Sequence, residues 1–128
     1  MKKLFLLLSL IFISLNANAG WKKIHHEAGE ATLYYHTDTM EKSGGYTYVW
    51  AMTDVPKENI KFNFGARSNQ VFLQVDCGPM KRYKMLSINR YKGPMGTGGV
   101  KYSSKTPDEE WTFIPPDNPL YTIFKYAC

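Results

Sequence analysis

The two cysteines, Cys77 and Cys128, have the clearest chemistry in this chain of 128 residues. In an oxidising compartment two cysteines form one disulfide, whereas in the cytosol they stay as free thiols. For an exported chain we therefore expect a bond between Cys77 and Cys128, which chain-entropy arithmetic makes worth ~4 kcal/mol. Neither sulfur then remains available as a nucleophile.

Three histidines, His25, His26 and His36, are the candidates for metal ligation. His25 and His26 are adjacent, so on a strand their side chains point to opposite faces. A metal site would need His36 or a carboxylate such as Glu27 to converge with one of them. We expect solvated strand histidines instead, and we predict neither a metal site nor a cofactor.

Two further stretches resemble catalytic motifs without completing them. Segment 93–99 is rich in glycine but lacks the Gly-Lys-Ser/Thr ending that cradles phosphate, so we expect a mobile hairpin loop. Asp108, Glu109 and Glu110 form an acidic run, whereas paired catalytic carboxylates normally come from separate elements that face a cleft. No serine has the local sequence of a nucleophile elbow. We therefore predict a binding protein and no enzyme.

The best candidate for a binding site is a group of basic and aromatic residues centred on segment 81–92. Tyr and Arg are enriched at interface hot spots, so such a patch suits a protein partner. The alternative is a solvated sheet face whose charges keep the protein in solution. The predicted partner-binding residues are Arg67, Arg82, Lys84, Arg90, Tyr83 and Tyr91.

Regular alternation along one long strand would place Arg82, Lys84 and Arg90 on a single face. It would place Tyr83 and Tyr91 on the other face. Burying three cations without partners would be costly, so we expect the charged face to be the one open to a partner.

The N-terminus indicates export. A basic start precedes an apolar run over residues 4–15, which is shorter than the ~20 residues of a membrane-spanning helix. An Ala-x-Ala pattern at 17–19 then matches the site that a signal peptidase cleaves, and no cysteine follows it for lipid attachment. We predict a signal peptide over residues 1–19 and a single domain over residues 20–128. A retained membrane anchor is the alternative.

The formal net charge of +5 falls to +3 without the two lysines of the predicted signal peptide. That charge permits weak attraction to acidic surfaces. The chain has no Arg/Lys stripe of the kind that binds phosphate backbones. We therefore predict no nucleic-acid partner, and no stable membrane insertion after cleavage.

Strand-forming residues dominate the remaining sequence, with frequent Gly and Pro between them. Residues 46–53 and 70–77 are the clearest strands, because apolar or aromatic side chains alternate in them. Gly78-Pro79 turns the chain into a long return strand over 81–91. Shorter strands are predicted at 21–26, 30–36, 60–64, 100–103 and 110–114.

The last segment has the pattern of a helix. Asn118 suits an N-cap and Pro119 suits the first helical position. A helix this short needs docking, and a bond from Cys128 to Cys77 would tether it to the apolar face of strand 70–77. The sequence thus predicts an α+β, mainly β fold: an antiparallel sheet of about six strands with a C-terminal helix disulfide-tethered to one face. The apolar positions at helical spacing are Leu120, Ile123, Phe124 and Ala127.

Two cysteine-anchored spacings resemble those of the surface-adhesin protein E family, small exported proteins of Gram-negative bacteria. The resemblance covers about residues 21–128, and Trp50 and Trp111 also lie where such domains often have an aromatic residue. The two spacings are Ala66-Arg67-Ser68 with Cys77 after eight more residues, and Pro116-Asp117 with Leu120-Tyr121 after two and Cys128 after six.

The resemblance implies the same combination of sheet and tethered helix, and adhesion to host extracellular proteins such as vitronectin and laminin. The predicted function is therefore that of an exported cell-envelope binding protein, located in the periplasm, at the cell surface or outside the cell. The alternative is a periplasmic accessory or inhibitor protein that acts on an envelope enzyme or assembly.

Overall fold

The computed structural model describes residues 20–25 and 29–128. The predicted signal peptide lies outside them, and so do the candidate ligands His26 and Glu27. No helix in the described part of the chain is long and apolar enough to cross a membrane. The strands are β1 (Trp21–His25), β2 (Thr32–His36), β3 (Glu41–Ser43), β4 (Tyr46–Asp54), β5 (Ser68–Asp76), β6 (Arg82–Tyr91), β7 (Val100–Ser104) and β8 (Thr112–Phe113).

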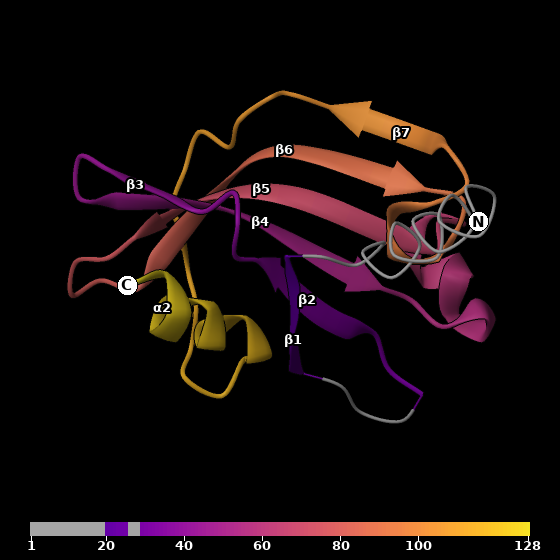
Figure 1. The fold of residues 1–128 in the computed structure, drawn as a ribbon, viewed down its shortest axis with the longest axis horizontal. Helices are drawn as coiled ribbons and strands as arrows, with labels where there is room; N and C mark the ends of the chain where they lie inside the picture. The colour runs from indigo at the N-terminus through magenta and orange to yellow at the C-terminus, as the bar shows by residue number, and fades with distance from the viewer. Residues whose placement is uncertain (1–19, 26–28) are drawn as a thin grey trace, which may run out of the picture.

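These strands form one antiparallel sheet in the order β1-β2-β4-β5-β6-β7 (Figure 1). Two short strands add to this path, since β3 pairs with β4 and β8 pairs with β6. The predicted fold class is confirmed, with eight strands instead of about six. The shorter helical elements are η1 (Lys57–Asn63), η2 (Pro94–Gly96), η3 (Pro119–Tyr121) and α2 (Thr122–Ala127).

The strand predicted at 60–64 is wrong, because η1 occupies this segment. Local hydrogen bonds replace the ladder that a strand would need: Gly65 N–H donates to Ile60 O at 2.8 Å, and Asn63 Nδ2 donates to Ala66 O at 3.0 Å. Side chains such as Asn offer the backbone this local alternative to a sheet.

The two faces of the sheet differ as the alternation in β4 predicts. Thr47, Val49 and Ala51 are fully buried on the side that faces α2, which we call the helix face. Tyr46 and Tyr48 lie on the other side and are half-buried, so we call that side the open face. The core on the helix face consists of Tyr35, Val49, Ala51, Leu73, Val75, Ile114, Ile123, Phe124 and Ala127.

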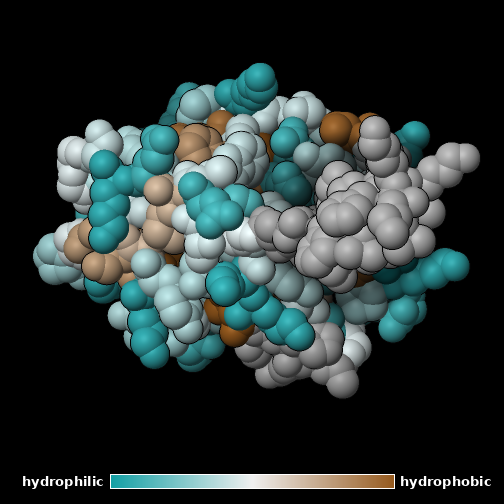
Figure 2. Space-filling view, viewed as in Figure 1, coloured by the Kyte–Doolittle hydropathy of each residue, from teal (hydrophilic) through white to brown (hydrophobic). Residues whose placement is uncertain are grey.

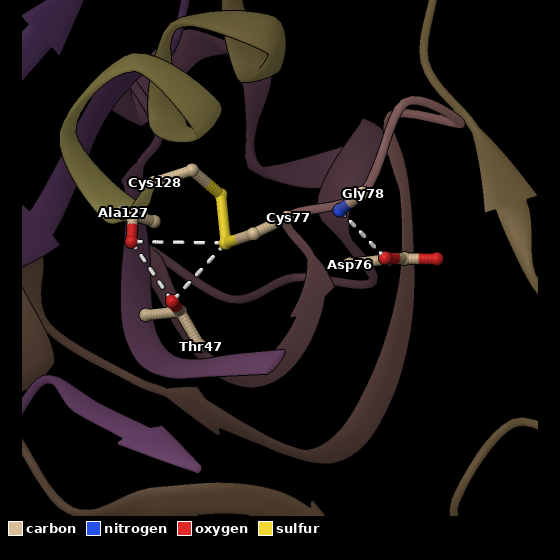
Figure 3. Close-up of a disulfide and its surroundings, with 6 residues drawn as sticks. All are labelled: Thr47, Asp76, Cys77, Gly78, Ala127 and Cys128. Carbon is tan, nitrogen blue, oxygen red and sulfur yellow. Dashed lines mark hydrogen bonds between the residues drawn. A yellow bond between two sulfur atoms is a disulfide. The ribbon is translucent and has the colours of Figure 1, made fainter. Parts of the chain in front are cut away.

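The C-terminal helix is tethered as predicted (Figure 3). A disulfide joins Cys77 to Cys128, with their Cα atoms 5.4 Å apart. Beside it, the Thr47 hydroxyl donates a hydrogen bond of 2.8 Å to Ala127 O. Asn118 caps the segment, because its Oδ1 accepts from Leu120 N at 2.9 Å. Burial of the apolar positions of α2 thus combines with a covalent link and a cap to hold a very short helix.

A β-bulge in β6 corrects the predicted arrangement of the basic residues. Phe72 pairs with Ser87 and Leu73 pairs with Met85, so Leu86 is an extra residue in β6. An extra residue reverses the alternation of side chains beyond it.

The bulge places Arg82 and Lys84 on the open face and Arg90 on the helix face, so the prediction that the three share a face is wrong. Tyr83 and Tyr91 are likewise separated. Tyr83 pairs with Val75 on the helix face, and Tyr91 lies on the open face.

The glycine-rich segment 93–99 folds back over one end of the open face. Met95 N–H donates to Asp54 Oδ1 at 3.1 Å, and Gly96 N–H donates to Ser68 Oγ at 2.9 Å. Gly96 has a φ of 74°, and a Cβ there would lie 2.5 Å from Gln70 Nε2, so glycine is required. The segment is a structural cover for this end of the sheet, and the rest of the open face stays uncovered by it.

Candidate functional site

A row of aromatic side chains crosses the open face. Trp50 and Phe72 are cross-strand partners whose rings stack with centroids 4.9 Å apart, and Phe72 also contacts Tyr48 at 6.2 Å. Tyr46 stacks on Trp111 at 5.6 Å with an angle of 22° between the rings. We call Tyr46, Tyr48, Trp50, Phe72 and Trp111 the aromatic row. Alternation along β4 and pairing with β5 place the first four members, since side chains two residues apart share a face.

Two cations lie over Trp111. The Cζ of Arg82 is 4.5 Å from the ring centroid, and the Nζ of Lys84 is 5.0 Å from it. Trp111 belongs to the segment between β7 and β8, and pairing of Arg82 with Phe113 brings that segment against the start of β6. Each cation–π contact at an exposed site is worth ~0.5–1 kcal/mol.

Asp76 fixes one of these cations. Its Oδ2 accepts from Arg82 Nε at 2.7 Å, and its Oδ1 accepts from Gly78 N–H at 2.9 Å. The hydrogen bond from Arg82, followed by that from Gly78, lowers the pKa of Asp76, while burial of the carboxyl opposes the shift. Arg82 is therefore charge-balanced, whereas Lys84 has no ion pair among the described residues.

A hollow of about 290 Å³ lies at the other end of the row, lined by Trp21, His36, Thr39, Trp50 and Gln70. Trp21 packs edge-on against His36 with ring centroids 4.8 Å apart. The hollow has apolar walls from the two tryptophans and hydrogen-bonding groups from the other three residues. It could receive one side chain of a partner that lies along the row.

Hydrophobic surface on the face turned to the viewer in Figure 2 is divided into separate patches among hydrophilic residues. The open face mixes aromatic rings, polar groups and cations in the same way. Such a mixture suits contact with a protein surface better than contact with a purely apolar ligand. Within the residues that the structure describes, no three His, Cys, Asp or Glu side chains lie together as a metal site would require.

Of the six residues predicted to bind a partner, Arg82 and Lys84 lie together beside the aromatic row. Tyr91 faces the same side, where its hydroxyl donates to Gln70 Oε1 at 3.3 Å. Its binding role stays a prediction, as do those of the other five.

The remaining three residues lie elsewhere. Arg67 is half-buried, and its Nε donates to Val55 O at 3.1 Å, which ties the end of β4 to the start of β5. Tyr83 packs against the core on the helix face, where burial, followed by the charge of Asp108, raises its pKa. Arg90 lies on the helix face near the opposite end of β6.

Sequence reasoning did not assign the aromatic row as a site. The alternation in 46–53 already placed Tyr46, Tyr48 and Trp50 on one face, and this was the signal that could have found it. Phe72 and Trp111 join them only through strand register and a long-range contact, which the sequence pattern does not reveal.

Comparison with known proteins gives one family and one fold. The family model described as surface-adhesin protein E matches residues 21–128. A structure of Haemophilus influenzae protein E is similar, with a TM-score of 0.63 and 15% identity over 86% of this chain and 87% of that chain. Its selenomethionine form has a TM-score of 0.64 and 14% identity, over 86% of each chain.

Protein E from non-typeable Haemophilus influenzae has a TM-score of 0.57 and 12% identity, over 84% of this chain and 74% of that one. At such low sequence identities, the structural similarity shows a shared fold alone. Curated protein sequences give no match.

Proposed function

This chain belongs to the surface-adhesin protein E family, and on that premise we propose that it is an exported cell-envelope protein that adheres to a host extracellular protein through the aromatic row. Adhesins act by binding, so the family supports a function without catalysis. The contact expected to dominate binding is Trp111 with its two cations, Arg82 and Lys84.

One observation favours this surface above the others. Trp111 contacts Tyr46 on β4 and both cations of β6, at 4.5 to 5.6 Å. Aromatic and arginine side chains that are fixed before binding lose little conformational entropy when a partner arrives. Lys84, which has no ion pair within residues 20–25 and 29–128, adds attraction to an acidic partner.

The test is binding of the mature protein to immobilised vitronectin and laminin. The variant Trp111→Ala with Lys84→Gln should bind about tenfold more weakly or worse, because it removes an aromatic hot spot together with its free cation. Lys125→Gln is the matched control, since Lys125 is exposed on α2, outside the aromatic row. Equal binding by parent and variant to both proteins, with both folded, would contradict the proposal.

Labelling of intact cells tests the adhesive role itself. A membrane-impermeant reagent should label Lys84 and its neighbours on cells that express the protein, because an adhesin must be displayed outside. Recovery of unlabelled protein from the periplasm alone would support the accessory or inhibitor role instead.

A further inference from the structure

A second basic and aromatic cluster lies on the helix face, away from the aromatic row. The guanidinium carbon of Arg90 is 4.4 Å from the ring centroid of Phe64 and 5.1 Å from that of Tyr102. Both rings are exposed, Phe64 at 74% and Tyr102 at 49%. Arg90 and Tyr102 are cross-strand partners, whereas Phe64 reaches the same place from the end of η1.

Phe64 adopts an unusual backbone conformation where it contacts Arg90. Its φ of 56° and ψ of 30° lie in the left-handed region, which bulky residues rarely adopt. A side chain that large is normally buried, but here the backbone turns it outward onto Arg90. Strain of this kind is a reason to look for function at the position.

The charge of Arg90 has no counterpart in the part of the chain that the structure describes. Among the described residues it forms no ion pair, and its Nε is buried without a hydrogen-bond partner. A second positive charge lies beside Phe64, since Lys101 Nζ donates to Gly65 O at 3.4 Å. A guanidinium packed against two aromatic rings keeps its planar fork of donors, which suits a carboxylate.

The cluster also adjoins a free edge of the sheet. Tyr102 belongs to β7, which ends the strand order and lies at the edge of the sheet in Figure 1. Val100 on the same strand is 53% exposed. Extended peptides can add to such an edge through backbone hydrogen bonds while side-chain pockets give the specificity.

We propose that the Arg90 cluster (Phe64, Arg90, Lys101 and Tyr102) binds an acidic, extended segment of a partner protein along β7. The uncompensated positive charge selects a carboxylate, and the exposed rings accept apolar side chains next to it. A peptide supplies both of these together with a backbone that can pair with β7. The cluster lies on the face opposite the aromatic row, so its test is independent of the proposed function.

The probe is a short fluorescein-labelled extended peptide in which pairs of Glu alternate with pairs of Val, so that both side chains occur on each face. It is titrated with the mature protein and followed by anisotropy. A peptide in which Gln replaces Glu is the control for charge. We expect the Glu peptide to bind and the Gln peptide to bind at least about tenfold more weakly, because a lost charge pair leaves Arg90 uncompensated. Amide shifts in NMR spectra should change at β7 and Phe64 and stay unchanged at Trp111.

Arg90→Gln should reduce binding of the Glu peptide about tenfold or more. Lys42→Gln is the matched control for net charge, because Lys42 is exposed on β3 near the Cys77 end of the sheet. If Arg90→Gln does not fold, Arg90→Lys serves, since lysine keeps the charge and loses the planar fork, and it should also weaken binding.

Three results would overturn the proposal. The first is an equal loss of Glu-peptide binding in Arg90→Gln and Lys42→Gln, and the second is equal binding of the Glu and Gln peptides. The third is full binding of the Glu peptide by a folded variant that combines Arg90→Lys with Lys101→Gln. If a sulfated oligosaccharide binds in an Arg90-dependent way and the Glu peptide does not bind, the partner is a glycan and the proposed protein partner is wrong.

Discussion

At the scale of single residues, Trp111 connects two parts of the open face, because it touches Tyr46 on β4 and both cations of β6. We expect Trp111→Ala to lower the free energy of unfolding by ~1–3 kcal/mol, from one aromatic pair and two cation–π contacts. Urea denaturation measures this loss. Phe113→Ala, at a 56% exposed position of β8, should cost less than about 0.5 kcal/mol. Equal losses in the two variants would show that Trp111 has no special structural role.

Asp76 predicts a dependence of stability on pH. Its pKa is lower in the folded protein because Arg82 and Gly78 donate to the carboxylate. A group with a lowered folded pKa stabilises the protein above its unfolded value of ~3.9 and loses that contribution as the pH falls through the folded value. Between neutral pH and acid, the free energy of unfolding should fall more steeply in the parent than in Asp76→Asn. Parallel curves for the two proteins would contradict this assignment.

At the scale of elements, the β6 bulge decides which side chains meet the helix face. Met85 and Ser87 pair with consecutive residues of β5, so deleting Leu86 would restore regular pairing and leave Tyr83 and Arg90 on the faces that they now occupy. Since Tyr83 and Met85 then keep their packing against the core, we expect the deletion variant to fold cooperatively. Near-UV circular dichroism and a thermal melt would show it. Leu86→Ala keeps the bulge and should also remain folded. A deletion variant that does not melt cooperatively would show that Leu86 is not the extra residue of β6.

The disulfide governs the docking of α2. Replacing Cys77 and Cys128 together by Ala removes the cross-link without leaving a free thiol, and we expect a loss of ~2–4 kcal/mol, mainly through the unfolded state. Ile123 and Phe124 are buried in the parent, with 2% and 4% of their surface exposed. Without the disulfide, α2 should open more often, so the backbone amides of these two residues should exchange faster with solvent. Hydrogen exchange measures this effect. Unchanged exchange in α2 would mean that packing alone holds the helix.

The same elements show what the sequence can and cannot predict. Alternation identified β4 and β5, and the Asn118-Pro119 pair identified the start of the C-terminal helical segment, because both signals are local. The bulge has no such signal: Leu86 fits a regular strand, and only pairing with β5 makes it an extra residue. The binding patch was consequently assembled with Arg90 on the wrong face.

At the scale of the whole molecule, surfaces depend on contacts between distant segments. Trp111 meets Tyr46 across about half of the chain, and Phe64 meets Arg90 from a different element. Sequence spacing therefore indicated which residue types could bind, but not which of them lie together. The predicted role of the open face rests on an arrangement that only the folded chain provides.

Export is the property of the whole molecule that can be tested most directly. We expect the exported protein to begin at Gly20, because an Ala-x-Ala pattern precedes it. Intact-mass spectrometry of protein from the envelope and the medium measures this. A mass that retains residues 1–19 would favour an N-terminal anchor, and cytosolic material alone would remove the basis for the adhesive role.

On the proposed adhesive role, the Cys77–Cys128 bond has a mechanical consequence. Its two cysteines are separated by 51 positions, so roughly 170 Å of extended chain cannot be drawn out while the bond is intact. Strands β6, β7 and β8, together with Trp111 and Arg90, all belong to this shielded stretch. Under tension the chain before Cys77 can be extended, whereas the stretch closed by the disulfide cannot. The disulfide would thus limit how far the protein extends under load, an effect separate from its contribution to equilibrium stability.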